Sequence, residues 1–152
     1  MTTRVARPAD LIALATQAPE LGTSDWRTIS QQQVDLFADA TDDHQWIHVE
    51  PDRAKAGPFG TTIAHGYLTL SLASAFIGEI LHVDHIGMAV NYGLNKVRFP
   101  APVPVGARLR GALRLTSAVP RGDTVEVVLT LTIHVDGGDR PACVAEVVVL
   151  YR

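Results

Sequence analysis

Residues 41–51, TDDHQWIHVEP, are the part of the sequence in which side chains capable of acid–base chemistry are most concentrated. They include two adjacent carboxylates, Asp42 and Asp43, and two imidazoles, His44 and His48. A carboxylate and an imidazole can hold one water molecule by two hydrogen bonds and remove its proton near neutral pH. The same residues also suit a solvated loop in which the aspartates cap helices, so both interpretations stay open.

A metal site is the second chemistry that this segment could support. His44 and His48 are four residues apart, which would place both imidazoles on one face of a helix. The neighbouring Pro51 and the aspartates disfavour a helix here, and the single thiol, Cys143, lies far away in the sequence. We therefore expect no metal ion at this site.

A second candidate group is formed by His65 and Gly66, which lie near the start of the apolar segment IAHGYLTLSLAS, residues 63–74. Free N–H groups in the first turn of a helix can stabilise an anionic oxygen, and a glycine lets a ligand carbonyl approach closely. Alternatively, Gly66 only permits a tight turn and His65 acts as a cap. Ser74 lies two helical turns beyond Gly66 on the same face, where it would otherwise be an ordinary small core residue.

Composition limits the classes of protein to which these groups can belong. The chain has 152 residues, of which 47% are hydrophobic, and it carries 13 Lys and Arg against 16 Asp and Glu. A net charge of −3 and an aromatic content of 6% argue against a nucleic-acid partner. Because the sequence has no internal repeat and no long linker, we expect one domain over residues 1–152.

Cysteine use and the N-terminal residues predict the compartment. A single cysteine cannot form an intrachain disulfide, which favours a reducing environment. The first ten residues, MTTRVARPAD, lack the apolar run of a signal peptide. The longest apolar stretch, residues 67–81, contains Gly78 and Glu79 and is shorter than the ~20 residues that cross a bilayer. We therefore expect a cytoplasmic protein with no membrane partner.

The elements that would position the candidate groups are helical in the first half of the chain. We expect helical segments at about residues 7–17, 31–41, 51–56 and 66–81. Ser30 and Gln33 match a capping box at the start of the second segment. Residues 41–51 are interpreted as a loop. The last helix is apolar almost all round, so other elements or a second subunit must enclose it.

After residue 85 the apolar period changes to two, which is typical of half-buried antiparallel strands. The expected strands cover residues 87–99, 108–115, 125–135 and 141–151. Residues 120–123 (PRGD) would form one hairpin turn, and Gly137-Gly138 the next. One buried helix followed by an antiparallel meander of about five strands is the pattern of an α+β hot-dog fold, in which a curved sheet wraps round a central helix.

Three separated segments resemble MaoC-like (R)-specific enoyl-CoA hydratases. Residues 43–48, DHQWIH, are similar to the family motif Gly-Asp-x-Asn-Pro-(Leu/Ile/Val)-His and keep the Asp-to-His spacing of five residues. IAHG, residues 63–66, and Ser74 resemble the family's helix entrance, and residues 91–103 resemble the following strand. The resemblance covers roughly residues 24–115.

The motif departs from the family pattern at its centre. Asp42 stands where the family usually has Gly, and Gln45-Trp46 replaces Asn-Pro, as in the nodulation-protein-N-like branch. Aspartate tolerates a left-handed conformation, so Asp42 need not break the turn. Trp46 would add bulk near the pocket.

The resemblance implies a mechanism in which Asp43 and His48 activate a water that adds to C3 of a trans-2-enoyl thioester, and then return a proton to C2. The Gly66 N–H would stabilise the thioester enolate as an oxyanion hole. Ser74 would help to position the dyad. The product would be an (R)-3-hydroxyacyl thioester, and the reverse reaction its dehydration. No metal or other cofactor is implied, because the thioester itself makes C3 electrophilic.

The resemblance also implies the partners of the chain. The substrate would be an acyl-CoA or acyl-carrier-protein thioester, and the chain would form a homodimer in which two sheets join edge to edge. Two other functions stay open: a hot-dog acyl-CoA thioesterase, which hydrolyses the thioester, and a non-catalytic protein that binds acyl thioesters. The Asp-to-His spacing and the His65-Gly66 helix entrance favour the hydratase.

Overall fold

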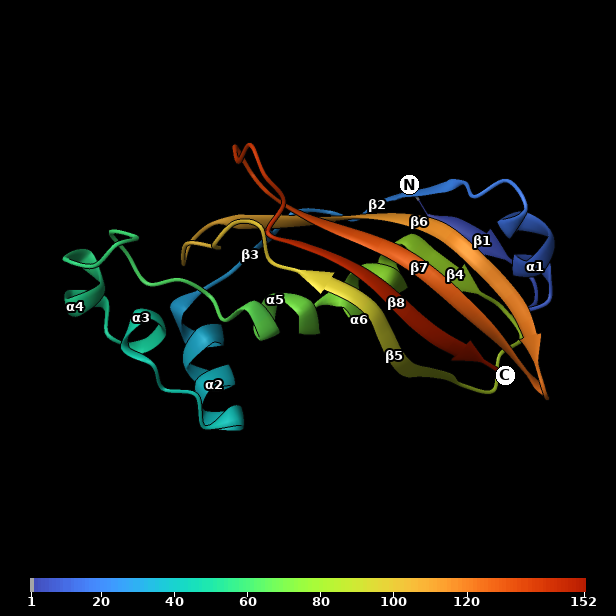
Figure 1. Cartoon of the computed structure of the whole chain (residues 1–152), viewed down its shortest axis with the longest axis horizontal. Coiled ribbons are helices and arrows are strands. Elements are labelled where there is room, and N and C mark those ends of the chain that lie inside the picture. The colour runs from blue at the N-terminus through green and yellow to red at the C-terminus, as the bar shows by residue number, and fades with distance from the viewer. Residues whose placement is uncertain (1) are drawn as a thin grey trace.

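The computed structural model describes residues 2–152, and its centre is a strongly curved antiparallel sheet (Figure 1). The strands lie in the order β2-β6-β7-β8-β5, and β3 also pairs with β6. Their bounds are β2 (Glu20–Thr23), β3 (Arg27–Thr28), β5 (Ala89–Arg98), β6 (Arg108–Arg121), β7 (Thr124–Val135) and β8 (Cys143–Tyr151). The α+β hot-dog architecture is confirmed. The sheet has six strands rather than about five, because β2 and β3 are too short for apolar alternation to reveal them.

Apolar side chains on alternate residues of the central strands form the inner face of the sheet. Leu113, Leu129 and Leu131 are fully buried, and Leu113 lies opposite Leu131 in the register of β6 and β7. These two strands are joined by a turn at Gly122-Asp123, where Gly122 has a φ of +59°. The expected turn at residues 120–123 is therefore too long, because its first two residues continue the strand ladder.

Two helices, α5 (Gly66–Ser71) and α6 (Ala73–Ile80), lie against the inner face of the sheet (Figure 1). The prediction of one helix over residues 66–81 is wrong at Leu72, where the helix is interrupted. The hydroxyls of Thr69 and Ser71 donate back to carbonyl oxygens four residues earlier, and such bonds bend helices. Within residues 2–152, no helix is long and apolar enough to cross a membrane.

Helix α6 packs most closely where it crosses β6. Phe76 is fully buried, and a Cβ placed on Gly111 of β6 would come within 2.9 Å of the Phe76 side chain. Only glycine allows this approach. A parallel pair of strands, β1 (Thr3–Val5) and β4 (Leu81–Val83), and the helix α1 (Asp10–Ala15) lie at the other end of α6. The helix expected at residues 7–17 is therefore present but shorter.

Residues 31–65, which we call the overhang, lie beyond the other end of the sheet (Figure 1). They carry the helices α2 (Gln31–Thr41), α3 (Trp46–Val49) and α4 (Pro51–Lys55). The predicted capping box is confirmed: the Ser30 hydroxyl accepts from the Gln33 N–H, and the Gln33 side chain accepts from the Ser30 N–H. Residues 41–51 are not a loop throughout, because one turn of helix, α3, carries His48.

Candidate active site

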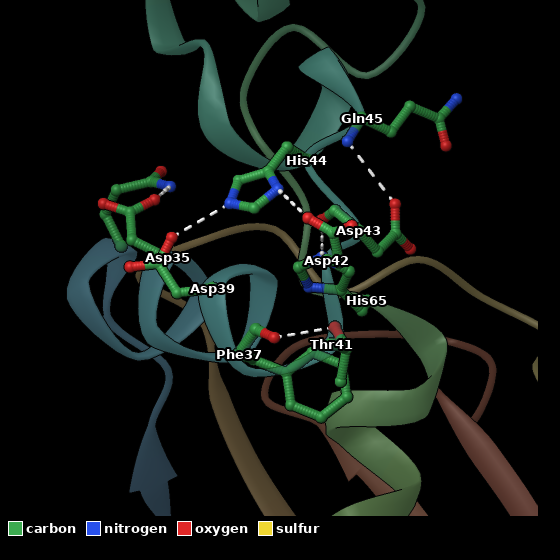
Figure 2. Close-up of polar contacts among 10 residues, drawn as sticks. Asp35, Phe37, Asp39, Thr41, Asp42, Asp43, His44, Gln45 and His65 are labelled. Carbon is green, nitrogen blue, oxygen red and sulfur yellow. Dashed lines mark hydrogen bonds and ion pairs between the residues drawn. The ribbon is translucent and has the colours of Figure 1, made fainter.

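The C-terminus of α2 sets the direction of the segment that carries the acid–base residues. Asp42 has a φ of +60°, in the left-handed region, which ends the helix as a C-terminal glycine would. His44 is exposed, and its Nε2 lies 2.9 Å from a carboxylate oxygen of Asp39 (Figure 2). It therefore does not join His48 in the metal pair considered from the sequence.

His48 is buried, and the main chain fixes the position of its proton. Its Nδ1 lies 2.6 Å from the carbonyl oxygen of Ile63. Because a carbonyl oxygen only accepts hydrogen bonds, Nδ1 carries the proton and Nε2 keeps its lone pair. Burial, as the largest cause, lowers the pKa of His48 from its ordinary value. Near neutral pH the imidazole is therefore uncharged, and Nε2 is available as a base.

Gln31, the first residue of α2, holds the backbone of His48 through its side-chain amide. Its side-chain N–H donates to the His48 carbonyl oxygen at 2.7 Å, and its amide oxygen accepts from the Thr62 hydroxyl at 2.6 Å. Sequence analysis did not identify Gln31, because the contact joins residues that are 17 positions apart. The two bonds fix α3 between α2 and the segment that leads to α5.

A carboxylate oxygen of Asp43 and one ring nitrogen each of His48 and His65 all lie within 4.8 Å of one another. A water molecule hydrogen-bonded at about 2.8 Å to two atoms can bridge a gap of up to about 5.6 Å, so one water fits between Asp43 and His48. Asp43 is exposed, and its carboxylate also accepts from the Gln45 N–H at 3.4 Å. The structure thus brings together the two residues selected from the sequence. One carboxylate and two imidazoles are also a donor set that a divalent metal accepts.

His65, which the sequence places in a second candidate group with Gly66, also belongs to this group. Its side chain makes no capping hydrogen bond; its Nε2 lies 2.9 Å from the carbonyl oxygen of Asp43 (Figure 2). Its ring stacks on His48, with centroids 3.8 Å apart and an angle of 24° between the planes. The position of His65 at a helix start was the only signal in the sequence, and it does not report a contact across 22 residues.

Gly66 is the first residue of α5, so its N–H has no acceptor within the helix. It lines the same cavity as His48, with a volume of about 290 Å³ and a largely apolar wall that includes Phe59, Ile63 and Phe99. A Cβ placed on Gly66 would lie 3.3 Å from the ring of Phe99. The absence of a side chain therefore keeps the helix start uncrowded, and the oxyanion-hole role of Gly66 stays a prediction.

Two residues lie elsewhere than predicted. The Ser74 hydroxyl accepts from the Asn91 amide at 3.0 Å and lines a different groove, of about 370 Å³, between the helices and β5. Within this chain Ser74 is therefore not placed beside the dyad. Trp46 packs under the guanidinium of Arg53 at 4.6 Å and against Gly57, and is not among the described residues that line the His48 cavity. The bulk that the sequence predicts near the pocket from Trp46 lies against Arg53 and Gly57.

Comparison with known families and proteins identifies relatives of this chain. The MaoC-like domain matches residues 15–137. The chain is 54% identical over 144 residues to 3-hydroxyacyl-thioester dehydratase Z of Mycobacterium tuberculosis (strain CDC 1551 / Oshkosh), covering 94% of each chain. It is 47% identical over 129 residues to nodulation protein N of Rhizobium leguminosarum bv. viciae, covering 83% of this chain and 80% of that protein.

A solved structure, the (R)-hydratase from A. caviae involved in PHA biosynthesis, has a TM-score of 0.69 and 27% sequence identity. The match covers 88% of this chain and 97% of that one. The resemblance drawn from the motifs, including its nodulation-protein-N-like branch, is confirmed. The chain therefore belongs to the MaoC-like domain family and, like the thioester dehydratase among its relatives, it is a hydro-lyase.

Proposed function

We propose that the protein catalyses the reversible addition of water to trans-2-enoyl thioesters, which gives (R)-3-hydroxyacyl thioesters. The observation that carries the proposal is that an uncharged base, His48, and the free N–H of Gly66 line one cavity, with a carboxylate oxygen of Asp43 within 4.8 Å of a ring nitrogen of His48. Acid–base groups and an oxyanion donor are the two devices that this reaction needs.

In the forward direction, Asp43 orients the water and Nε2 of His48 removes its proton. The water oxygen forms a bond to C3 while the electrons of the C2=C3 double bond move toward the thioester carbonyl. The Gly66 N–H donates to the carbonyl oxygen, which gains negative charge. The proton held by the dyad then passes to C2, so the product contains the elements of one water. The conjugated thioester makes C3 electrophilic, so this route needs no metal and no cofactor from the protein.

The stereochemistry follows from the position of the dyad. Asp43 and His48 lie on one segment and reach one face of a bound enoyl group, so they deliver the oxygen and the proton to the same side. We therefore expect syn addition, and the resemblance to (R)-specific hydratases implies an (R) product. The decisive assay uses 2-enoyl-CoA thioesters of increasing chain length, with loss of enoyl absorbance, free thiol and product chirality measured together. Release of thiol would identify a thioesterase, and an (S) product would contradict the assigned geometry.

The proposed substrates are acyl thioesters carried by CoA or by an acyl carrier protein, and the proposed compartment is the cytoplasm. The (R)-hydratase in the solved neighbour and the thioester dehydratase among the relatives support this class of substrate. Comparing turnover of the same enoyl group on CoA and on an acyl carrier protein identifies the carrier directly.

We further propose that the chain acts as a homodimer. Nine of the ten residues of β5 are exposed, and within residues 2–152 this edge strand pairs with β8 on one side only. Its exposed apolar side chains include Val90, Tyr92 and Leu94. A long apolar edge strand is a surface that soluble proteins normally cover. Light scattering at micromolar concentration should give the mass of a dimer; a fully active monomer would contradict this proposal.

A further inference from the structure

The imidazole of His65 contacts three segments of the overhang that surround the dyad. Its Nε2 donates to the carbonyl oxygen of Asp43, and its ring stacks on that of His48. Phe37 of α2 packs against the same ring, with centroids 5.0 Å apart. One side chain therefore contacts α2, the segment after α2, and α3.

The hydrogen bond to Asp43 fixes the tautomer of His65. The acceptor is a carbonyl oxygen, so Nε2 must carry the proton and Nδ1 keeps a lone pair. This Nδ1 is buried and has no hydrogen-bond partner among residues 2–152. Leaving a buried polar atom unpaired is unfavourable. An apolar side chain would avoid that cost, so the reason for a histidine must lie in the Nε2–H bond and in the aromatic stacking.

The backbone of His65 is tied to the helix that presents the oxyanion donor. Its carbonyl oxygen accepts from the N–H of Thr69 at 3.1 Å, which is the first hydrogen bond of α5. Gly66 is the next residue along the chain. A single peptide unit thus connects the group that contacts Asp43 and His48 to the group that would bind the thioester oxygen.

We propose that His65 is a positioning residue, which holds the Asp43 backbone and the His48 ring at a fixed distance from the Gly66 N–H. This inference rests on the proposed hydration activity. His65 does not touch the reacting atoms; it keeps the bridging water of the dyad in line with the oxyanion hole. Displacing reacting groups by about 1 Å can lower turnover by roughly 100-fold, which sets the scale of the expected effect.

The test compares two substitutions that differ in hydrogen-bonding ability. His65→Leu removes the donor and the stacking, whereas the side-chain amide of His65→Gln can reach the position of Nε2 and donate to Asp43. We expect His65→Leu to lower kcat on the order of 100-fold with KM changed by less than about threefold, and His65→Gln to recover at least about tenfold of the loss. Equal kcat in the two variants, or wild-type kcat in His65→Leu, would overturn the proposal.

Phe37→Leu serves as the matched control, because it alters the packing of the His65 ring and leaves the bond to Asp43 in place. We expect it to change kcat by less than about threefold. A loss as large as that of His65→Leu would show that general packing, and not the Nε2–H bond, is responsible.

A second measurement does not depend on turnover. Nitrogen-15 NMR of the imidazoles in the wild-type protein should show His65 protonated on Nε2 and His48 protonated on Nδ1. A His65 protonated on Nδ1 alone would overturn the inference even in an active enzyme. If the wild-type protein hydrates no enoyl thioester but shows the expected tautomers, the proposed function fails while the positioning contact stands.

Discussion

The inner face of the sheet and the overhang each contain side chains that are almost completely buried, yet these buried groups differ in kind. Residues such as Leu113, Leu131 and Phe76 in the sheet and α6 are apolar and make contacts in every direction. The buried groups of the overhang include His48 and His65, each of which is held by one directed bond to a carbonyl oxygen. Apolar packing is spread over many neighbours, whereas a directed bond has a single partner. We therefore expect changes in the overhang to alter chemistry first, and changes in the core to alter stability first.

The sharpest test of this contrast removes the dyad. Asp43→Asn and His48→Gln should each lower kcat by about 10²–10⁴-fold, because each removes a group that moves or orients the proton. Steady-state kinetics measures the loss, and thermal unfolding checks the fold. Near wild-type turnover in either variant would refute the assigned mechanism.

The reverse effect is expected in the core. Phe76→Ala should lower the free energy of unfolding by about 3–5 kcal/mol, because it opens a cavity between α6 and β6. Urea titration measures this change, and kcat per folded molecule should stay near the wild-type value. Leu36→Ala, at a side chain that is 60% exposed, is the control and should change stability by less than about 0.5 kcal/mol. A stable Phe76→Ala variant would show that the core is not held in this way.

Gly66 lies where the two regions meet, and its substitution should affect chemistry more than stability. Gly66→Val would place a branched side chain against Phe99 and block the approach to the N–H. Loss of one oxyanion donor typically costs ~2.7–4 kcal/mol in the barrier, so kcat should fall by about 10²–10³-fold. Gly78→Ala is the matched control, because a Cβ there meets no described atom within 4 Å. Circular dichroism separates a misfolded Gly66→Val variant from a folded inactive one; unchanged kcat in a folded variant would place the substrate elsewhere.

The pH dependence should show the smallest effect. Burial lowers the pKa of His48, so the base form persists below the ordinary imidazole value of about 6.5. We expect kcat/KM to decrease on the acid side only below that value. This decrease, which protonation of His48 alone causes, should be absent from the pH profile of His48→Gln. The same pKa shift affects the free energy of unfolding. As the pH falls, the unfolded state binds this proton first, so the stability that depends on an uncharged His48 is lost between about pH 6.5 and the lowered pKa. An acid limb above the ordinary value would contradict the burial argument.

Local sequence patterns predicted the parts of the molecule that depend on local physics. Ser30 and Gln33 form the capping box that their spacing indicated, and Asp42 adopts a left-handed conformation, which aspartate tolerates. Alternation located β6 and β7, because each has one buried face. The placement of Asp43 and His48 in one group followed from their spacing within a single short segment.

The missed features all depend on contacts between distant residues. His65 reaches Asp43 across 22 positions, and Gln31 reaches His48 across 17. Ser74 bonds to Asn91 rather than to the dyad, because α6 carries it toward β5. The predicted helix is interrupted at Leu72, next to the hydroxyl bonds of Thr69 and Ser71. Helical periodicity does not report such bonds. The periodicity of apolar residues identifies the buried face of a helix or strand. It does not show which helices and strands contact each other.

The use of main-chain carbonyl oxygens to hold both imidazoles has a consequence for adaptation. A side-chain substitution does not remove the main-chain oxygens of Ile63 and Asp43, so we expect the proton positions of His48 and His65 not to depend on the identity of the cavity wall. Phe59 and Phe99 can therefore vary in size without disturbing the acid–base pair. A library restricted to these two wall positions should yield variants with altered acyl preference and an unchanged pH profile. The acyl specificity of the cavity could then be redesigned separately from its acid–base chemistry.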